Sequence, residues 1–471
     1  MWAMVTTDKA ELLKSFLAGL PESLALRLAK AVELDRLSES DSLPHDLILD
    51  GLRPILRRAL RVDRTPTPRR LFCRPFEDLL TSSPRREKQR GRIARSSVVP
   101  VWNWLSQTLL AEKTIAYCTE ARAAILDYRP QDILACASGF WELAAGAMDA
   151  ALADEGARKS ARLALGGELA LADAGEMATL LSAAPEICAL QDAMPKPQHT
   201  LSDSMLEAFR TLYDRLGDSV PHAAPYLDVI AMNRLERPWE ALRLSALVRR
   251  PAQETDGGDG GLGLAGELLL ADLEGHIIAV RAVRPPQFDS HALIDHLSGF
   301  AILSAGIARE AEMRRDAPWS QRLMKDRAVV AEIMDDMMQR APREVLSALP
   351  MQKTGAYGGG PRVPDLSRPF DGEKAGRAQS YARLLAGCRS LAEQLAFSAP
   401  LVQADNELGV ALKSYCDDLV RELRAAGGAE RGRAEQYFAL TVDLASILFS
   451  AEEGEFLRRR GRAAVSARAA A

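Results

Sequence analysis

Apolar residues recur every three or four positions along most of the chain, with polar and charged residues between them. This spacing places the apolar side chains on one face of a helix, where a neighbouring helix can cover them. The pattern is clearest over residues 101–154, 201–216, 225–236, 289–350 and 377–462. We therefore predict a mainly α fold built from multi-helix bundles.

One segment in the middle of the chain departs from this pattern. Residues 267–283 read ELLLADLEGHIIAVRAV, in which two apolar runs, partly β-branched, flank Glu274-Gly275. A tight turn at Glu274-Gly275 would pair the two runs as strands. We predict a small β-hairpin here, covered by helices because a single hairpin is only marginally stable in water.

Glycine and proline divide the chain into regions. Residues 62–100 are rich in proline and arginine, which predicts an extended loop between helices. Before this loop, Gly51 and Pro54 allow either one kinked helix or two separate helices. The predicted organisation is an N-terminal helical region at 1–250 that includes the loop at 62–100, a Gly-rich linker at 251–266, a hairpin with helices at 267–352, a Gly/Pro-rich loop at 353–376 and a C-terminal helical bundle at 377–471.

Composition describes an ordinary globular chain. Its 471 residues are 47% hydrophobic and 26% charged, enough apolar surface to offset the conformational entropy lost on folding. The formal net charge of −4 favours no class of partner.

Cysteine usage and the N-terminal sequence concern the compartment. The six cysteines are scattered and contain no Cys-x-x-Cys pair, so we interpret them as free thiols in the core. The first residues lack a cationic segment that leads into an apolar one, which argues against a secretory signal. Charged residues interrupt every apolar stretch before the roughly 18 positions that a membrane span requires. We expect a cytoplasmic protein with no transmembrane segment.

The sequence contains no motif that identifies a catalytic, cofactor or metal site. Gly261, Gly263 and Gly266 match the glycine spacing of a dinucleotide-binding turn, but no strand precedes them and no helix is predicted after them. His291 and Asp295 lie one helical turn apart, without further ligands to complete a metal site. We therefore predict no catalytic residues, no cofactor and no metal, although a catalytic site assembled from distant residues leaves no such motif.

Positive charge is concentrated between residues 53 and 95. Fourteen Lys and Arg side chains stand there against four Asp and Glu, in a chain whose total charge is slightly negative. Arginine pairs well with carboxylates and phosphates. We predict that these cations contact an anion or a partner: Arg57, Arg61, Arg69, Arg70, Arg85, Arg86, Lys88, Arg90 and Arg92. A second basic run near the C-terminus is interpreted as a frayed, solvated chain end; it contains Arg458, Arg459, Arg460, Arg462 and Arg468.

These observations favour a non-enzymatic helical adaptor or scaffold that binds a protein partner, in which residues 53–95 dock onto an acidic surface. The sequence leaves open whether that surface belongs to a partner or to the protein itself. Two alternatives remain open. The same segment can bind nucleic acid or another polyanion through phosphate contacts, and the chain can be an enzyme with an unrecognised active site. The sequence leaves the oligomeric state undetermined.

Overall fold

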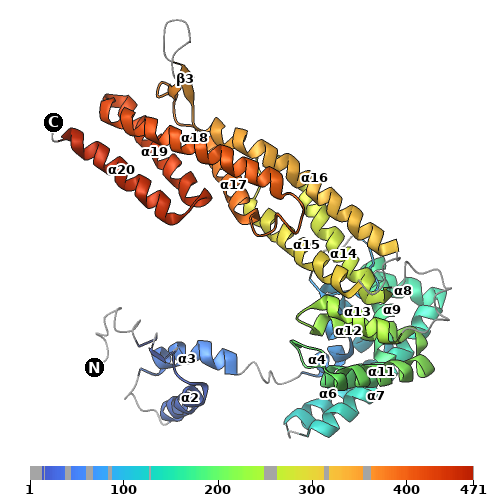
Figure 1. Cartoon of the computed structure of the whole chain (residues 1–471). Coiled ribbons are helices and arrows are strands. Elements are labelled where there is room, and N and C mark those ends of the chain that lie inside the picture. The colour runs from blue at the N-terminus through green and yellow to red at the C-terminus, as the bar shows by residue number, and fades with distance from the viewer. Residues whose placement is uncertain are drawn as a thin grey trace. The chain divides into compact units, whose positions relative to one another are not determined.

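The structure is a computed structural model in which most described residues belong to a helix (Figure 1). This confirms the prediction of a mainly α fold. The described residues are 13–14, 16–17, 19–37, 44–59, 67–82, 87–126, 129–248, 262–311, 318–353 and 362–469.

Two compact units make up the chain. The first contains Met1–Glu77 and Arg95–Ser182, and the second contains Asp78–Ala94 and Ala183–Ala471. The polypeptide therefore passes between the units three times. Residues 78–94 belong to the second unit although the residues on both sides of them belong to the first.

The first unit begins with a helical pair, α2 (Glu22–Leu37) and α3 (His45–Ala59). The pair has its own small core, formed by Leu17, Ala25, Leu52 and Ile55. The sequence allowed either one helix or two separate helices around Gly51 and Pro54. Helix α3 continues through both residues, so there is a single helix.

The rest of the first unit packs around aromatic side chains. Phe72 contacts Phe76 and Phe140, with ring centroids 5.5 and 6.0 Å apart, and Trp141 donates a hydrogen bond to the Leu71 carbonyl. The elements are α4 (Pro68–Cys73), the 3-10 helix η2 (Arg74–Leu79), which runs into the second unit, α5 (Arg95–Trp104), the π-helix η3 (Leu105–Leu109), α6 (Ala111–Leu126), α7 (Pro130–Ala153), α8 (Glu155–Leu165) and α9 (Glu168–Ser182).

The predicted loop at 62–100 is wrong over most of its described part. Thr67 caps the N-terminus of α4 by accepting a hydrogen bond from the Arg70 backbone, and Pro68 occupies the first turn, where no backbone donor is needed. Phe72 and Phe76 are fully buried. Packing of these rings stabilises short helices in a stretch whose proline content alone indicated a loop.

The second unit is a longer helical array that begins with two short strands. It contains β1 (Leu80–Thr81), β2 (Ile93–Ala94), α10 (Ala184–Ala193), α11 (Asp203–Ser219), η4 (Pro221–Ala223), α12 (Pro225–Arg234), η5 (Pro238–Glu240), α13 (Ala241–Val248), α14 (Gly263–Ala282), α15 (Ser290–Ala311), α16 (Pro318–Ser347), β3 (Met351–Lys353), β4 (Arg362–Pro364), α17 (Gly372–Cys388), α18 (Ser398–Ala425), α19 (Gly428–Leu448) and α20 (Ala451–Ala469). Strands β1 and β2 pair in parallel, which joins the two ends of residues 80–94.

The predicted hairpin at 267–283 is wrong, because this segment lies in helix α14. Helices α12, α13, α15 and α16 all pack against α14, so its apolar residues are buried in several directions rather than along one face. A helix surrounded in this way is apolar nearly all round and loses its helical periodicity. Gly275 is tolerated because it lies on an exposed side, where a side-chain carbon would have nothing within 4 Å.

An antiparallel hairpin does occur, but further along the chain. Strand β3 pairs with β4, with Met351 opposite Pro364. Lys353 and the whole of β4 lie in the region predicted as a Gly/Pro-rich loop at 353–376. Of the predicted linker at 251–266, residues 251–261 lie outside the described residues, whereas 263–266 form the first turn of α14.

Helix α15 is the one helix in the described ranges that is long and apolar enough to cross a membrane, over Ser290–Glu310. Nearly half of this stretch is buried inside the protein, and α14 and α17 pack against it. This is the environment of a core helix and is consistent with the expectation that the chain has no transmembrane segment.

Candidate docking groove

Helices α18, α19 and α20 pack against one another at the C-terminal end of the second unit (Figure 1). A groove with a volume of about 450 Å³ lies between α19 and α20 and reaches the end of α18. On α19 its lining residues follow the spacing i, i+3, i+4, i+7 and i+8, which is one face of a helix. They are Glu435, Phe438, Ala439, Val442 and Asp443.

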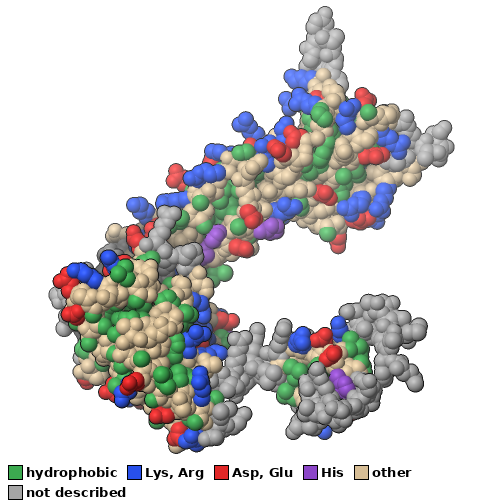
Figure 2. All heavy atoms as spheres, turned by 180° about the vertical axis from the view of Figure 1, so that it is seen from behind, with side chains coloured by type: hydrophobic (Ala, Val, Ile, Leu, Met, Phe, Trp, Pro, Cys, Tyr) green, Lys and Arg blue, Asp and Glu red, His purple; other side chains and the backbone are tan. Residues whose placement is uncertain are grey.

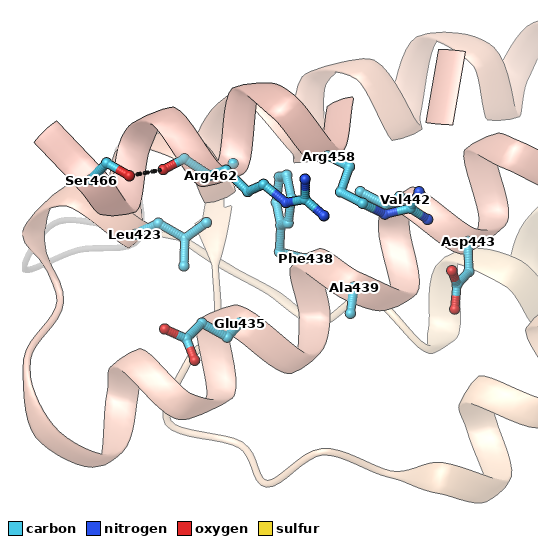
Figure 3. Close-up of a pocket in the computed structure, with 10 residues that line it drawn as sticks. Leu423, Glu435, Phe438, Ala439, Val442, Asp443, Arg458, Arg462 and Ser466 are labelled. Atoms are coloured by element: carbon cyan, nitrogen blue, oxygen red, sulfur yellow. Dashed lines mark hydrogen bonds between the residues drawn. The ribbon is translucent and has the colours of Figure 1, made fainter. Parts of the chain in front are cut away.

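The floor of the groove is apolar. Leu423 of α18 lines it at the end near Glu435 and Ser466, and Phe438 and Val442 line it from α19 (Figure 3). Gly461 of α20 lies directly against the Phe438 ring, since a side-chain carbon at Gly461 would be 2.2 Å from a ring atom. The absence of a side chain at Gly461 therefore allows α20 to approach α19 closely.

The two rims of the groove carry opposite charges. Glu435 and Asp443 stand on the α19 side, and Arg458 and Arg462 stand on the α20 side (Figure 3). The basic run at the C-terminus was interpreted from the sequence as a frayed, solvated end. Arg459 and Arg462 are indeed exposed and Arg458 and Arg460 half-buried, but the run is helical rather than frayed. It forms helix α20, in which Leu457 and Ala464 are buried.

A second hollow of about 540 Å³ lies between the end of α14 and α16. Its lining is mixed, with Arg281, Glu332 and Asp336 among apolar residues, and Asp336 is already paired with Arg340 at 2.9 Å. Arg281 lies on the α14 side and Glu332 and Asp336 on α16, but polar and apolar surface contribute about equally to its lining, whereas the lining of the groove is mainly apolar. The groove is therefore the stronger candidate for a binding surface.

The described residues contain no group of three or more His, Cys, Asp and Glu side chains that can hold a metal ion. Burial raises the pKa of the Cys73 and Cys388 thiols to about 12 and that of Cys416 to about 11. These thiols are protonated at neutral pH and are therefore poor nucleophiles.

The predicted arginine-rich site is divided between the two units. Arg69 and Arg70 are exposed on α4 in the first unit, where Arg70 lies 3.7 Å from Glu77. Lys88, Arg90 and Arg92 belong to the second unit. Arg61, Arg85 and Arg86 lie outside the described residues. The backbone of Arg57 is part of α3, but its side chain is not among those described.

Residues 87–94, hereafter the strap, contact helices of the second unit. Arg90 donates to the Tyr226 hydroxyl at 3.4 Å and lies over the Tyr226 ring, 5.2 Å from its centroid. Arg92 forms an ion pair with Asp272 and donates to the Leu268 carbonyl at 3.5 Å. Lys88 donates to the Arg92 carbonyl at 2.7 Å. These three cations thus have partners within their own chain.

A buried ion pair lies further toward the N-terminus, at the start of residues 78–94. Asp78 is 9% exposed and accepts hydrogen bonds from Arg234 at 2.8 Å and from Gln191 at 3.1 Å. Lys196 lies 3.5 Å from its second oxygen. These contacts attach the start of residues 78–94 to α10 and α12, and the pairing of β1 with β2 joins the two ends of that segment.

The groove residues were not identified from the sequence, because the two lining helices each look like ordinary amphipathic helices. One signal was present: Gly461 interrupts a helical run of arginines, and glycine inside a helix often marks close packing.

Comparison of the chain with protein families, with curated proteins and with solved structures finds no match. The groove and the charged contacts are therefore the basis for inferring function.

Proposed function

We propose that the protein is a non-enzymatic helical adaptor of the cytoplasm that binds a protein partner, and that the groove between α19 and α20 receives an amphipathic helix of that partner. The observation that carries this proposal is an apolar floor between two rims of opposite charge. Amphipathic helices bind grooves of this kind with their apolar face down.

The length of the groove suits two turns of helix. Its lining extends over nine residues of α19, from Glu435 to Asp443, and over nine of α20, from Arg458 to Ser466. At 1.5 Å per residue each side is about 12 Å long. Apolar anchors at positions i and i+7 of a bound helix are about 10.5 Å apart and fit within this length.

The chemistry of the lining favours binding over catalysis. No histidine or cysteine lines the groove, and Ser466 donates its hydroxyl to the Arg462 carbonyl one turn earlier in the same helix. A serine nucleophile needs a neighbouring base that accepts its proton, and this hydroxyl has a backbone carbonyl instead.

The arginine-rich segment has a separate part in the proposal. Docking of residues 53–95 onto an acidic surface is supported by Arg92, whose carboxylate partner Asp272 lies on α14 of the same chain. On the face seen in Figure 2, Lys and Arg side chains alternate with Asp and Glu over the elongated helical part. This mixture favours local pairing over contact with a polyanion on that face.

Binding of a designed peptide tests the proposed function. The probe is a fluorescent helical peptide of 18 residues with leucines at i, i+4 and i+7 and uncharged glutamine flanks, and fluorescence anisotropy reports its affinity. Ala439 is exposed and lines the groove, so Ala439→Trp should fill the groove and weaken binding at least tenfold. Ala463 is exposed on α20 outside the lining, so Ala463→Trp should leave the affinity unchanged.

Two results would contradict the proposal. Equal affinity of the peptide for the two tryptophan variants would place binding outside the groove. If dodecanoate binds and Ala439→Trp abolishes its binding, while no peptide binds at millimolar concentration, the groove is a site for small amphiphiles. Circular dichroism melts of both variants establish that they fold.

A further inference from the structure

The spacing of the rim charges differs between the two sides of the groove. Arg458 and Arg462 are four residues apart on α20, or about 6 Å along the helix. Glu435 and Asp443 are eight residues apart on α19, or about 12 Å. The rims therefore present two close cations on one side and two distant anions on the other.

The relative levels of these charges follow from the connection between the helices. Only Phe449 and Ser450 separate α19 from α20, and the two helices pack against each other, so they run antiparallel. Asp443 is then near the connected end of the groove, and Glu435 is near the open end with Ser466. Both arginines lie at intermediate levels (Figure 3).

The rim side chains are available for a partner. Within the described part of the chain, neither Asp443 nor Arg462 forms an ion pair through its side chain. Arg458 is paired with Glu455 at 2.6 Å and Glu435 with Arg431 at 3.1 Å. The first pair lies within α20 and the second within α19, and both are solvent-accessible. Replacing either intrahelical ion pair by one with a partner's charged side chain therefore costs little free energy.

We infer that the helix bound in this groove carries two acidic residues four positions apart on the flank that faces Arg458 and Arg462, and basic residues about eight positions apart on the flank that faces Glu435 and Asp443. This inference rests on the proposed function, because it specifies the partner of the same groove. It identifies the partner as a helix with one acidic and one basic flank. A flank with the same sign of charge as the rim that it faces would be repelled.

The size of the effect follows from ordinary surface ion pairs. Each exposed pair contributes a factor of about 1.8 in affinity, so four pairs together give roughly tenfold. Salt screens such contacts because the Debye length falls to about 3 Å at 1 M ionic strength. The preference should therefore be strong in low salt and nearly absent in 1 M sodium chloride, whereas apolar binding persists.

Four peptides with the same leucine face test the inference. Their flanks are acidic and basic in the pattern above, acidic on both sides, basic on both sides, or uncharged. The mixed peptide should bind about tenfold more tightly than the uncharged one at low salt. A peptide with its two flanks exchanged is not a control, since it can bind in the opposite direction.

Reversal of the cationic rim provides the decisive variant. Arg458→Glu/Arg462→Glu makes both rims acidic, so the fully basic peptide should become the tightest ligand and the mixed peptide should lose its advantage. The matched control is Arg459→Glu/Lys413→Glu, which changes the net charge equally at exposed or partly exposed positions outside the lining. It should preserve the order found for the unmodified protein.

The outcomes separate this inference from the proposed function. If the uncharged peptide binds and Ala439→Trp blocks it, but all four peptides bind equally or both charge variants rank them alike, the charge pattern is overturned and the groove remains a docking site. If the uncharged peptide does not bind at all, the proposed function itself fails.

Discussion

His276 of α14 and His296 of α15 lie with their Nδ1 atoms 3.2 Å apart, so that one imidazole donates a hydrogen bond to the other. Gly299 makes room for this contact, because a side-chain carbon there would be 2.4 Å from the His276 ring. Only one of the two Nδ1 atoms can carry the shared proton. The contact between α14 and α15 at this point therefore depends on at least one neutral imidazole.

Acidification should weaken this contact. Burial, and secondly the neighbouring His296, lower the pKa of His276, while Asp272 opposes the shift. The unfolded chain then binds more protons than the folded one, so the free energy of unfolding falls as the pH drops below about 6.5 and stops falling below the folded-state pKa. Urea unfolding of the wild type between pH 7.5 and 5 should show this loss.

The matched variant for the histidine pair is His276→Gln, which keeps a hydrogen-bond donor but does not titrate. The difference in unfolding free energy between pH 7.5 and 5 should be smaller for this variant than for the wild type. Identical pH dependence of the two proteins would show that the imidazole pair contributes nothing to it.

Removal of Arg234 should destabilise the second unit. Asp78 is nearly inaccessible and has Arg234 as its closest cation at 2.8 Å, so Arg234→Met leaves a buried carboxylate with weaker partners. We expect the free energy of unfolding to fall by about 3 kcal/mol, as measured by chemical denaturation. The exposed pair Lys159–Glu155, at 2.9 Å, is the control, and Lys159→Met should change stability by less than about 0.5 kcal/mol.

Two helical glycines should respond to alanine with opposite signs. A side-chain carbon at Gly306 of α15 would be 2.2 Å from the Trp239 ring, so Gly306→Ala should overpack this contact and cost about 1–2 kcal/mol. Gly376 of α17 is exposed with nothing within 4 Å, and Gly376→Ala should add about 0.5–1 kcal/mol by restricting the unfolded chain. Thermal melts that shift in the same direction would contradict the described packing at one of the two positions.

Periodicity predicted helices where one face meets solvent and the other meets the core. Helix α11 (Asp203–Ser219) and helix α18 (Ser398–Ala425) agree with the predicted segments because each has an exposed polar side. The same rule failed at α14, whose Leu268, Leu269 and Leu270 are all buried. Consecutive burial of this kind depends on helices that come later in the chain, so a short window cannot distinguish it from a strand.

The charged contacts were predictable as a class but not as pairs. An excess of arginine at 53–95 indicated a need for anionic partners, yet Arg92 meets Asp272 and Asp78 meets Arg234 across more than 150 positions of sequence. The groove depends in the same way on Gly461 and Phe438, which only the packing of α20 on α19 brings together. The residue types were visible in the sequence, whereas their juxtaposition arises only on folding.

The strap distinguishes docking within the protein from binding to a polyanion. Arg92 is largely buried, with 22% of its side chain exposed, and Arg90 lies over Tyr226. Arg90→Ala/Arg92→Ala should therefore lower the free energy of unfolding by about 1–3 kcal/mol, since charged hydrogen bonds are lost and Asp272 is left without this cation. Arg69→Ala removes an exposed arginine of the same segment and should change stability by less than about 0.5 kcal/mol.

Polyanion binding predicts a different result for these variants. Each phosphate contact contributes about −0.9 to the slope of log affinity against log salt for duplex DNA, so a double variant that removes two contacts should flatten that slope by about two. We expect no such change, because Arg90 and Arg92 already have partners on α12 and α14. Anisotropy titrations with a labelled duplex at several salt concentrations, beside urea melts of the same proteins, measure both quantities. Unchanged stability together with a flatter slope would overturn the docking interpretation and establish the strap as a nucleic-acid contact. Lower stability with an unchanged slope would show that Arg90 and Arg92 stabilise the second unit through contacts within the chain.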